Sequence, residues 1–345
     1  MTPAALFDIL HRDGHVASSG VPPIDVSDVA SPWYLRVLMG FMGWLGGMFV
    51  LGFFGALIAA FFSNFVGMVL LAIGLFAGSF AIYRTAPSND FATQFALAAS
   101  ICAQVVATLA YGNAVGLGMD IMNAASFVAV MQIALVFAMP NFLHRMLSTM
   151  FAVIAMFIAA EKGLLVPVFS GVVAFAFVLL ARAESTLVAS GRMMFADAVI
   201  NGLAVALLLP GAAYVGFLGN APWMPFSLYT SIAFAMVLVG WVALSTGRLP
   251  VMQRTAALMG AIIYAAVTWR APGLIASALV LLLAFGSGRR ALTGFALFAL
   301  VAYLSTYYYQ MHMTLATKSM VLALSGASLL VMWWGHRTYF NGERA

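Results

Sequence analysis

From about residue 35 onward the chain alternates long apolar runs with short polar breaks. A helix needs ~20 mostly apolar residues to cross the core of a bilayer. The runs predict twelve spans, near residues 37–61, 65–83, 93–111, 121–139, 144–160, 164–181, 195–218, 226–246, 255–269, 272–287, 291–311 and 315–335. They show no alternation of period two, which favours helices over the strands of a membrane barrel. We therefore expect an all-α fold, a polytopic integral membrane bundle of about twelve transmembrane helices.

Composition supports this interpretation and excludes other classes of protein. Hydrophobic residues make up 64% of the 345 positions and charged residues only 7%, whereas a soluble domain carries about 25% charged residues. The single cysteine, Cys102, excludes a disulfide framework and any paired-cysteine metal or redox motif. The net charge of +5 is spread without a basic run, so we expect no nucleic-acid partner.

The positive charges test the predicted spans. With twelve spans both termini share one side, and that side receives every lysine and arginine except Lys162, Arg270 and Lys318. Because cytoplasmic loops retain Lys and Arg, we expect both termini in the cytoplasm. Residues 1–34 form a cytoplasmic segment with a short amphipathic helix and a Pro/Gly linker, residues 35–337 the transmembrane domain, and residues 338–345 a cytoplasmic tail. No apolar run precedes residue 35, so we expect no cleavable signal peptide.

Two short spans have similar surroundings. The spans near 144–160 and 255–269 each enclose 15 uncharged residues between charged ones, and a proline follows each, Pro167 and Pro272. A duplicated unit of four helices would explain this, and its two hairpins would then pack as parallel copies. Alternatively, tight hairpins of apolar helices simply look alike.

Ionisable residues are costly in lipid, so they are candidates for function. The side opposite the termini holds few of them, and Lys318 lies inside an apolar run. Lys318 pairs with Asp120 or Glu161, or its ammonium reaches the lipid headgroups alone. Asp197, with Asn201 one turn later and Arg192 nearby, belongs to the cytoplasmic span ends, where a structural role is the simpler interpretation.

The densest polar cluster lies at the external end of the eleventh and twelfth spans. Tyr303, Thr306, Tyr307 and Gln310 share one helix face, and Tyr308 and His312 form a pair on another. An aromatic belt at the membrane interface is the alternative explanation for the tyrosines. The candidate binding corner comprises Tyr307, Tyr308, Tyr309, Gln310, His312, Lys318, Ser319, Asp120 and Glu161.

No metal or cofactor site is expected. The Met311-His312-Met313 triplet cannot bind one copper ion, because consecutive helical residues point about 100° apart. No HExxH, GxSxG, Walker-type or paired acidic motif occurs, so no catalytic residue is assigned. Other polar and small residues are interpreted as contacts between helices, namely Gln104, Thr108 and Tyr111 on one face, Gln132, and the pairs Gly43/Gly47, Gly74/Gly78 and Gly112/Gly116.

The stretch 303–335, YLSTYYYQMHMTLATKSMVLALSGASLLVMWWG, and the segment Ser31 to Val37 resemble a bacterial family called domain of unknown function 4401. Tyr307, Tyr308, Tyr309, Lys318, Ser319 and Gly326 match its characteristic positions, although the family more often has leucine at the position of Ala316. The resemblance implies a multi-pass protein of the bacterial inner membrane. It also implies kinship with domain of unknown function 2157, and association with a membrane-anchored partner that bears a GDYxxLxY motif and an extracytoplasmic domain.

Three functional hypotheses follow. The first is a subunit or scaffold of a membrane complex, without catalysis, whose external corner docks a partner beside the lipid bilayer. The second is a secondary transporter or channel for a small, uncharged or weakly polar solute, although only Gln104, Gln132, Pro210 and glycines lie near the bilayer midplane. The third is a lipid-modifying transferase, which requires Asp120, Glu161 and His312 to meet within hydrogen-bonding reach.

Overall fold

The computed structural model describes residues 38–49, 64–116, 120–160, 165–214, 227–269 and 271–310, and the single residues Arg12, Gly52, Gly55, Ala316 and Ser319. Within these residues the regular structure is all helical, as predicted, and no strand is present. Over the residues whose side chains are described, six helices are long and apolar enough to cross a membrane, and five shorter helical stretches are also apolar. These are the helices of a membrane protein.

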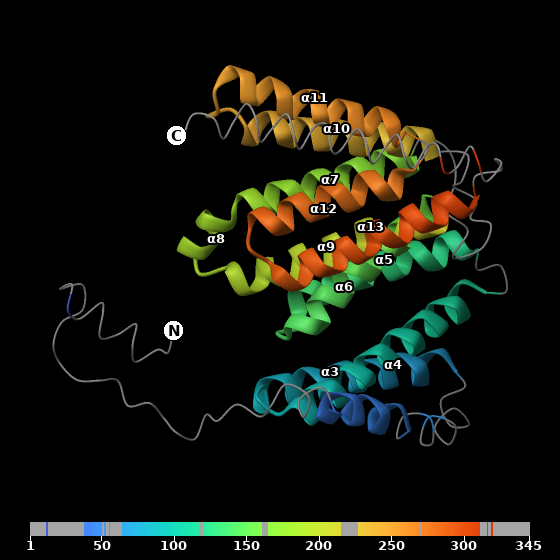
Figure 1. The fold of residues 1–345 in the computed structure, drawn as a ribbon. Helices are drawn as coiled ribbons and strands as arrows, with labels where there is room; N and C mark the ends of the chain where they lie inside the picture. The colour runs from blue at the N-terminus through green and yellow to red at the C-terminus, as the bar shows by residue number, and fades with distance from the viewer. Residues whose placement is uncertain are drawn as a thin grey trace.

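The helices follow one another along the chain (Figure 1). They are Leu38–Phe49, α3 Phe65–Thr85, α4 Asp90–Val115, α5 Ile121–Ala138, α6 Phe142–Ala159, α7 Leu165–Arg182, α8 Glu184–Ala189, α9 Met193–Tyr214, α10 Ser227–Ser245, α11 Val251–Val267, α12 Pro272–Gly286 and α13 Arg290–Gln310. A helix therefore lies at each predicted span from the first to the eleventh. The twelfth span, 315–335, lies outside the described residues except for Ala316 and Ser319, which are helical. The short helix α8 was not predicted.

Asparagine side chains fix the start of three helices. Asn64 Oδ1 accepts a hydrogen bond from the backbone N–H of Gly67 at 2.7 Å at the start of α3. Asn89 and Asn141 cap α4 and α6 in the same way, each at 3.0 Å. These bonds satisfy backbone donors that have no partner within the helix. At the other end of α4, Gly116 has a φ of +87°, which glycine adopts without strain.

Many arginines lie at one end of the bundle. Figure 1 shows that α7 and α12 end, and α9 and α13 begin, at the same end of the molecule as α8. These helix ends carry Arg182, Arg192, Arg289 and Arg290. The arrangement agrees with the predicted alternation of charge between the loops, and we call this end the arginine-bearing end.

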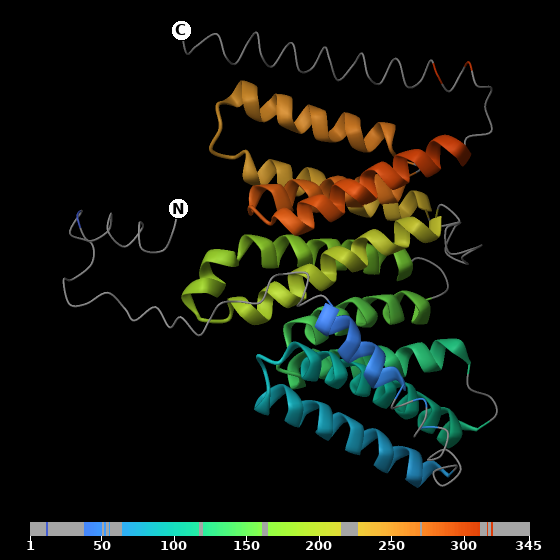
Figure 2. The ribbon, with the colours of Figure 1, turned by 60° about the horizontal axis from the view of Figure 1, so that its bottom comes forward.

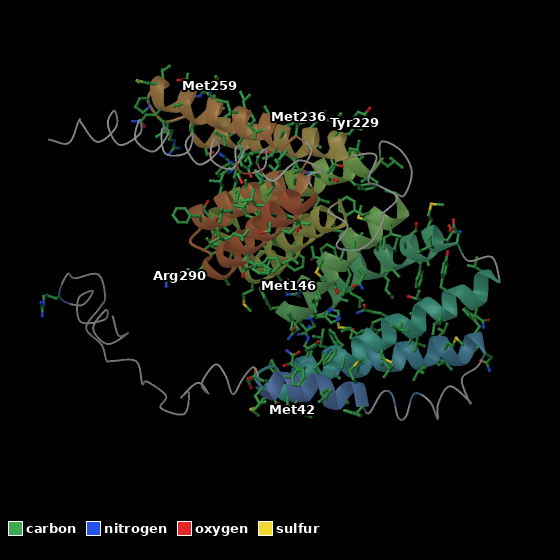
Figure 3. The ribbon with its side chains drawn as sticks, turned by 45° about the vertical axis from the view of Figure 1, so that its right-hand side comes forward. Met42, Met146, Tyr229, Met236, Met259 and Arg290 are labelled. Carbon is green, nitrogen blue, oxygen red and sulfur yellow. The ribbon has the colours of Figure 1, made fainter. Side chains whose placement is uncertain are left out.

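The largest apolar core lies in the second half of the chain. Helices α7 and α12 each pack against both α9 and α10. The core contains the fully buried side chains of Phe177, Leu207, Phe234, Ile275 and Leu279. Outward-facing side chains are also apolar, and Met236 on α10 and Met259 on α11 are exposed (Figure 3). An apolar exterior around an apolar core is expected of helices surrounded by lipid.

The first half of the chain forms the opposite edge of the molecule. Both Figure 1 and Figure 2 place α3 and α4 at one edge and α10 and α11 at the other. A small apolar cluster, Tyr83, Ala96, Leu135 and Met139, joins α3 to α4 and to the C-terminal end of α5. Helix α6 connects the two halves, because it packs against α5 and α9.

Of the predicted close helix contacts through glycine, one pair is confirmed. A β-carbon at Gly43 would lie 2.5 Å from the backbone oxygen of Phe91, and one at Gly47 would lie 2.7 Å from Ala98 Cβ, so helix Leu38–Phe49 approaches α4 there. The prediction for Gly74 and Gly78 is wrong, since no atom of the described residues lies within 4 Å of a β-carbon at either position. The buried face of α3 instead contains Ala72, Ser79 and Tyr83.

The predicted duplication is matched only partly. Helices α7 and α12 run in the same direction (Figure 1) and both pack against α9 and α10. Their preceding helices differ, because α6 packs against α9 whereas α11 packs against α10. The two hairpins therefore have different neighbours within the described part of the chain.

Candidate functional site

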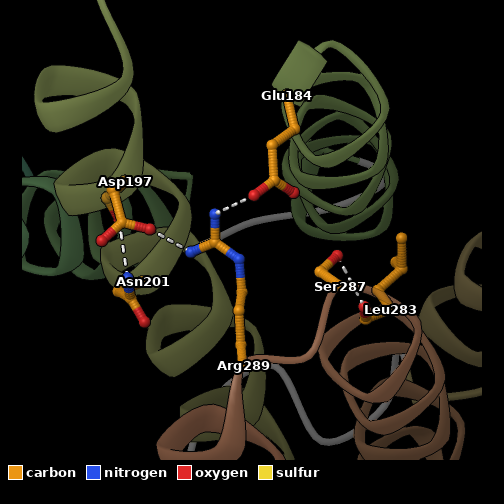
Figure 4. Close-up of polar contacts among 6 residues, drawn as sticks. All are labelled: Glu184, Asp197, Asn201, Leu283, Ser287 and Arg289. Atoms are coloured by element: carbon orange, nitrogen blue, oxygen red, sulfur yellow. Dashed lines mark hydrogen bonds and ion pairs between the residues drawn. The ribbon is translucent and has the colours of Figure 1, made fainter. Parts of the chain in front are cut away.

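An ionic network lies at the arginine-bearing end. Arg289, at the start of α13, donates a hydrogen bond through Nη1 to Asp197 of α9 and lies 3.7 Å through Nη2 from Glu184 of α8 (Figure 4). Asn201 Nδ2 donates to the backbone oxygen of Asp197 at 2.7 Å. The carboxylates are more than one-third exposed, and exposed ion pairs stabilise proteins little. The network connects α8, α9 and α13, and its geometry offers no reactive group.

A second polar cluster is fully buried around His144 on α6. The hydroxyl of Ser100 on α4 lies 2.7 Å from His144 Nε2, and the hydroxyl of Ser148 lies 3.2 Å from Nδ1. His144 is only 1% exposed. A neutral imidazole has one donor and one acceptor nitrogen, so both contacts can be hydrogen bonds at once. Tyr83 of α3 meets the imidazole edge to face, with ring centroids 5.9 Å apart.

Two polar atoms beside this cluster have no hydrogen-bond partner among the described residues. They are Tyr83 Oη and Arg145 Nε, and both are buried. The Arg145 guanidinium lies over the ring of Phe195 on α9, 5.2 Å from its centroid. Because buried polar groups are nearly always paired, two unpaired ones at one location make the surroundings of His144 a candidate site.

A hydrogen bond between two glutamine side chains connects α4 to α5. Gln132 Nε2 donates to Gln104 Oε1 at 2.7 Å, which confirms the prediction that these residues connect helices. Gln132 is 3% exposed, and its Oε1 has no hydrogen-bond partner among the residues that the structure describes. Gln104 follows Ser100 by one helical turn, and Thr108 follows Gln104 by another. We call Ser100, Gln104 and Thr108 the α4 polar line. Near its end Tyr111 stacks on Phe127 of α5, with ring centroids 4.4 Å apart.

An apolar groove lies beside the α4 polar line. It has a volume of about 490 Å³ and lies between α4, α5 and α6, within the ~300–1,000 Å³ typical of small-molecule sites. Its polar lining residues are Gln104, Thr108 and Gln132, its other lining residues are aliphatic, Met131 or Phe151, and no charged residue lines it. We call this space the α4–α6 groove.

Comparison with known proteins places the chain in one family. The family described as Domain of unknown function (DUF4401) matches residues 32–338. The chain belongs to this family. The match runs from before the helix Leu38–Phe49 to well past α13, so it includes every element that forms the His144 cluster and the groove. No curated protein and no solved structure matches the chain.

The corner predicted for this DUF4401 protein is described only in part. Residues 307–310 are the last helical residues of α13, whereas Glu161, His312 and Lys318 lie outside the described residues. Asp120 is exposed and precedes α5, where its backbone oxygen accepts from the N–H of Ala124 at 3.1 Å. Ser319 is exposed. The pairing of Lys318 with Asp120 or Glu161 stays a prediction.

Sequence reasoning missed the His144 cluster. One signal was present, because His144 and Ser148 stand one helical turn apart on the same face of a span. The partner Ser100 lies on another helix, 44 residues away, and spacing along the chain cannot reveal it. The ionic partner of Asp197, Arg289, is likewise 92 residues distant, so spacing along the chain does not reveal it.

Proposed function

We propose that this DUF4401 protein transports a small, weakly polar solute across a membrane, with the α4 polar line as part of the route. The observation that carries the proposal is a pair of hydrogen bonds that connect α4 to its neighbours. Ser100 bonds His144 of α6, and Gln104, one turn later on α4, bonds Gln132 of α5. Polar residues within membrane helices are costly, face the bundle interior and mark solute pathways in many transporters.

The chemistry of the line favours an uncharged solute. Its members are a hydroxyl, an amide and a second hydroxyl, and the side chains bonded to them are an imidazole and an amide. Such groups both donate and accept hydrogen bonds, so they can exchange partners with a neutral polar molecule. A cation would find no opposite charge among these groups, and its desolvation would be uncompensated.

The orientation of the protein is part of the proposal. The arginine-bearing end faces the cytoplasm of a bacterial cell, both termini lie on that side of the inner membrane, and the chain crosses it twelve times. The clustering of arginine at the connected ends of α7, α8, α9, α12 and α13 supports this orientation.

The proposal is tested by solute flux into vesicles. Purified protein in liposomes is exposed to an osmotic step of glycerol or urea, and vesicle reswelling is followed by stopped-flow light scattering. We expect reswelling faster than in protein-free vesicles, and a loss of most of that increment in Ser100→Ala. Ser170→Ala on α7 is the matched control, because Ser170 is equally buried but bonds only its own helix, at Val166 O. Reswelling equal to that of empty vesicles with both solutes would contradict the proposal.

The subunit hypothesis stays a second proposal, since its corner lies largely outside the described residues. It is supported by the concentration of tyrosines with Gln310 at the end of α13 and by the partner that the family resemblance implies. Purification from native membranes in mild detergent, followed by mass spectrometry, tests it. We expect a companion with an extracytoplasmic domain near one to one, recovered less well with Lys318→Met.

A further inference from the structure

The wall of the α4–α6 groove includes Gln132, which carries a buried hydrogen-bonding atom without a partner among the described residues. Gln132 lines the groove and is almost completely buried. Its Nε2 bonds Gln104, but its Oε1 has no partner in the described part of the chain. A buried amide atom without a partner costs free energy, so a protein that retains one either tolerates that cost or pairs it with a bound molecule.

The remaining lining residues restrict what that molecule can be. Apart from Gln104, Thr108 and Gln132 the groove presents Ile, Val, Leu, Ala, Met and Phe side chains, and none is charged. A carboxylate, phosphate or ammonium group would be desolvated there without a counter-charge. A long apolar body, in contrast, fits this lining and is abundant in the surrounding lipid.

The unpaired amide atom of Gln132 selects the polar group. A hydroxyl both donates and accepts one hydrogen bond, so it pairs with Gln132 whichever way the amide is oriented. A carbonyl could only accept. We infer that the α4–α6 groove binds one uncharged amphiphile with a hydroxyl on a long apolar chain, a long-chain alcohol, whose hydroxyl bonds the free amide atom of Gln132.

The groove is lined by Gln104 and Thr108 of the α4 polar line as well as by Gln132, but this inference does not depend on transport. The long-chain alcohol occupies the groove that opens between three helices, whereas the proposed solute passes along the buried hydrogen-bonded pairs. Binding and flux are therefore measured separately, and either can fail alone.

Photolabelling in nanodiscs tests the site. The probe is hexadecanol with a photoreactive diazirine in its chain, and the comparison probe is the corresponding alkane without the hydroxyl. After irradiation, labelled peptides are identified by mass spectrometry. We expect the alcohol to label peptides of α4, α5 and α6 at least fivefold more than the alkane does, and unlabelled hexadecanol to compete.

Two variants and a control locate the binding. Gln132→Leu removes the amide and should lower alcohol labelling at least fivefold, to the level of the alkane. Ala124→Phe fills the groove at a partly exposed lining residue and leaves the Gln104–Gln132 bond in place. It should lower labelling by both probes, which keeps the test decisive if Gln132→Leu folds poorly. Gln253→Leu makes the same exchange on α11, away from the groove, and should change nothing.

Several results would overturn the inference. Equal labelling by alcohol and alkane would show that lipid tails fill the groove without selection for a hydroxyl. Undiminished labelling in Ala124→Phe, or in a folded Gln132→Leu variant, would place the alcohol elsewhere. Specific labelling in a protein that conducts neither glycerol nor urea would uphold the site and contradict only the transport proposal. Flux without specific labelling would remove the alcohol site alone.

Discussion

Serines of equal burial have different partners in the two halves of this molecule. Ser100 on α4, Ser170 on α7 and Ser277 on α12 are each 0% exposed. Ser170 and Ser277 bond backbone oxygens of their own helices, Val166 and Gly273. Ser100 instead meets the imidazole of another helix. Helix α4 is thus joined to α5 and α6 by polar side chains, whereas α7, α9, α10 and α12 are connected mainly by apolar packing.

The contrast has a physical basis in the lipid environment. Lipid tails are as apolar as leucine, so burial of apolar surface provides little net attraction between helices. The second half compensates with a large, closely packed core. The first half has only a small apolar cluster, so its hydrogen bonds specify which helices meet. We therefore expect the second half to be destabilised most by substitutions that create cavities, and the first half by substitutions that remove hydrogen-bond partners.

The largest loss of stability is expected from a cavity in the core of the second half. Phe177 on α7 is fully buried, and Phe175 on the same helix is exposed. Phe177→Ala should lower the free energy of unfolding by about 3 kcal/mol, the lower end for such truncations, because lipid removes much of the transfer contribution. Phe175→Ala should cost under ~1 kcal/mol. Thermal or detergent unfolding compares the two, and equal costs would contradict a packed core.

A somewhat smaller effect is expected where the two halves meet. A β-carbon at Gly202 on α9 would lie 2.5 Å from the backbone oxygen of Met146 and 2.7 Å from Thr149 Cβ, both on α6. Gly202→Ala should therefore destabilise by about 2 kcal/mol, as overpacking typically does. Gly240→Ala on α10, where no described residue lies within 4 Å of the added β-carbon, should stabilise by up to ~1 kcal/mol through helix propensity. A stabilising Gly202→Ala would show that α6 and α9 do not cross there.

The positions of the helices were predictable because lipid imposes a minimum length on every span. Apolar runs therefore located α3 to α7 and α9 to α13, although ends shifted where a cap was overlooked. Helix α4 begins at Asp90 rather than 93, since Asn89 caps it. Helix α8 was missed because Glu184–Ala189 is a short helix outside any apolar run.

The candidate site was less predictable because it depends on which helices are neighbours. Residues of one helix face could be recognised from spacing, as with Gln104 and Thr108, but Gln132 and His144 reach α4 only through the packing of three helices. Polar side chains also looked equivalent in the sequence. Nothing in the local sequence of Ser100 distinguishes it from Ser170, whose hydroxyl bonds its own helix.

The hydrogen bond of Ser100 should contribute a moderate amount to stability. Ser100→Ala leaves His144 Nε2 buried and without that partner, which should cost about 1–2 kcal/mol. Ser170→Ala leaves no other side chain unpaired, because its acceptor Val166 O belongs to the same helix, and should cost about 0.5 kcal/mol or less. Unfolding of the two variants in one detergent measures the difference. Equal costs would mean that the partner of a buried serine makes no difference here.

The smallest expected effect is the coupling free energy between Gln104 and Gln132, which measures their hydrogen bond separately from the burial of each side chain. In a double-mutant cycle of Gln104→Leu and Gln132→Leu, each single variant leaves one amide without its partner, and the double variant leaves none. The coupling should be about 0.6 kcal/mol, typical for hydrogen bonds between membrane helices. Coupling near zero would mean that the 2.7 Å contact contributes nothing to the association of α4 and α5. The polar half would then be connected through the Ser100–His144 bond and the packing of Tyr111 on Phe127.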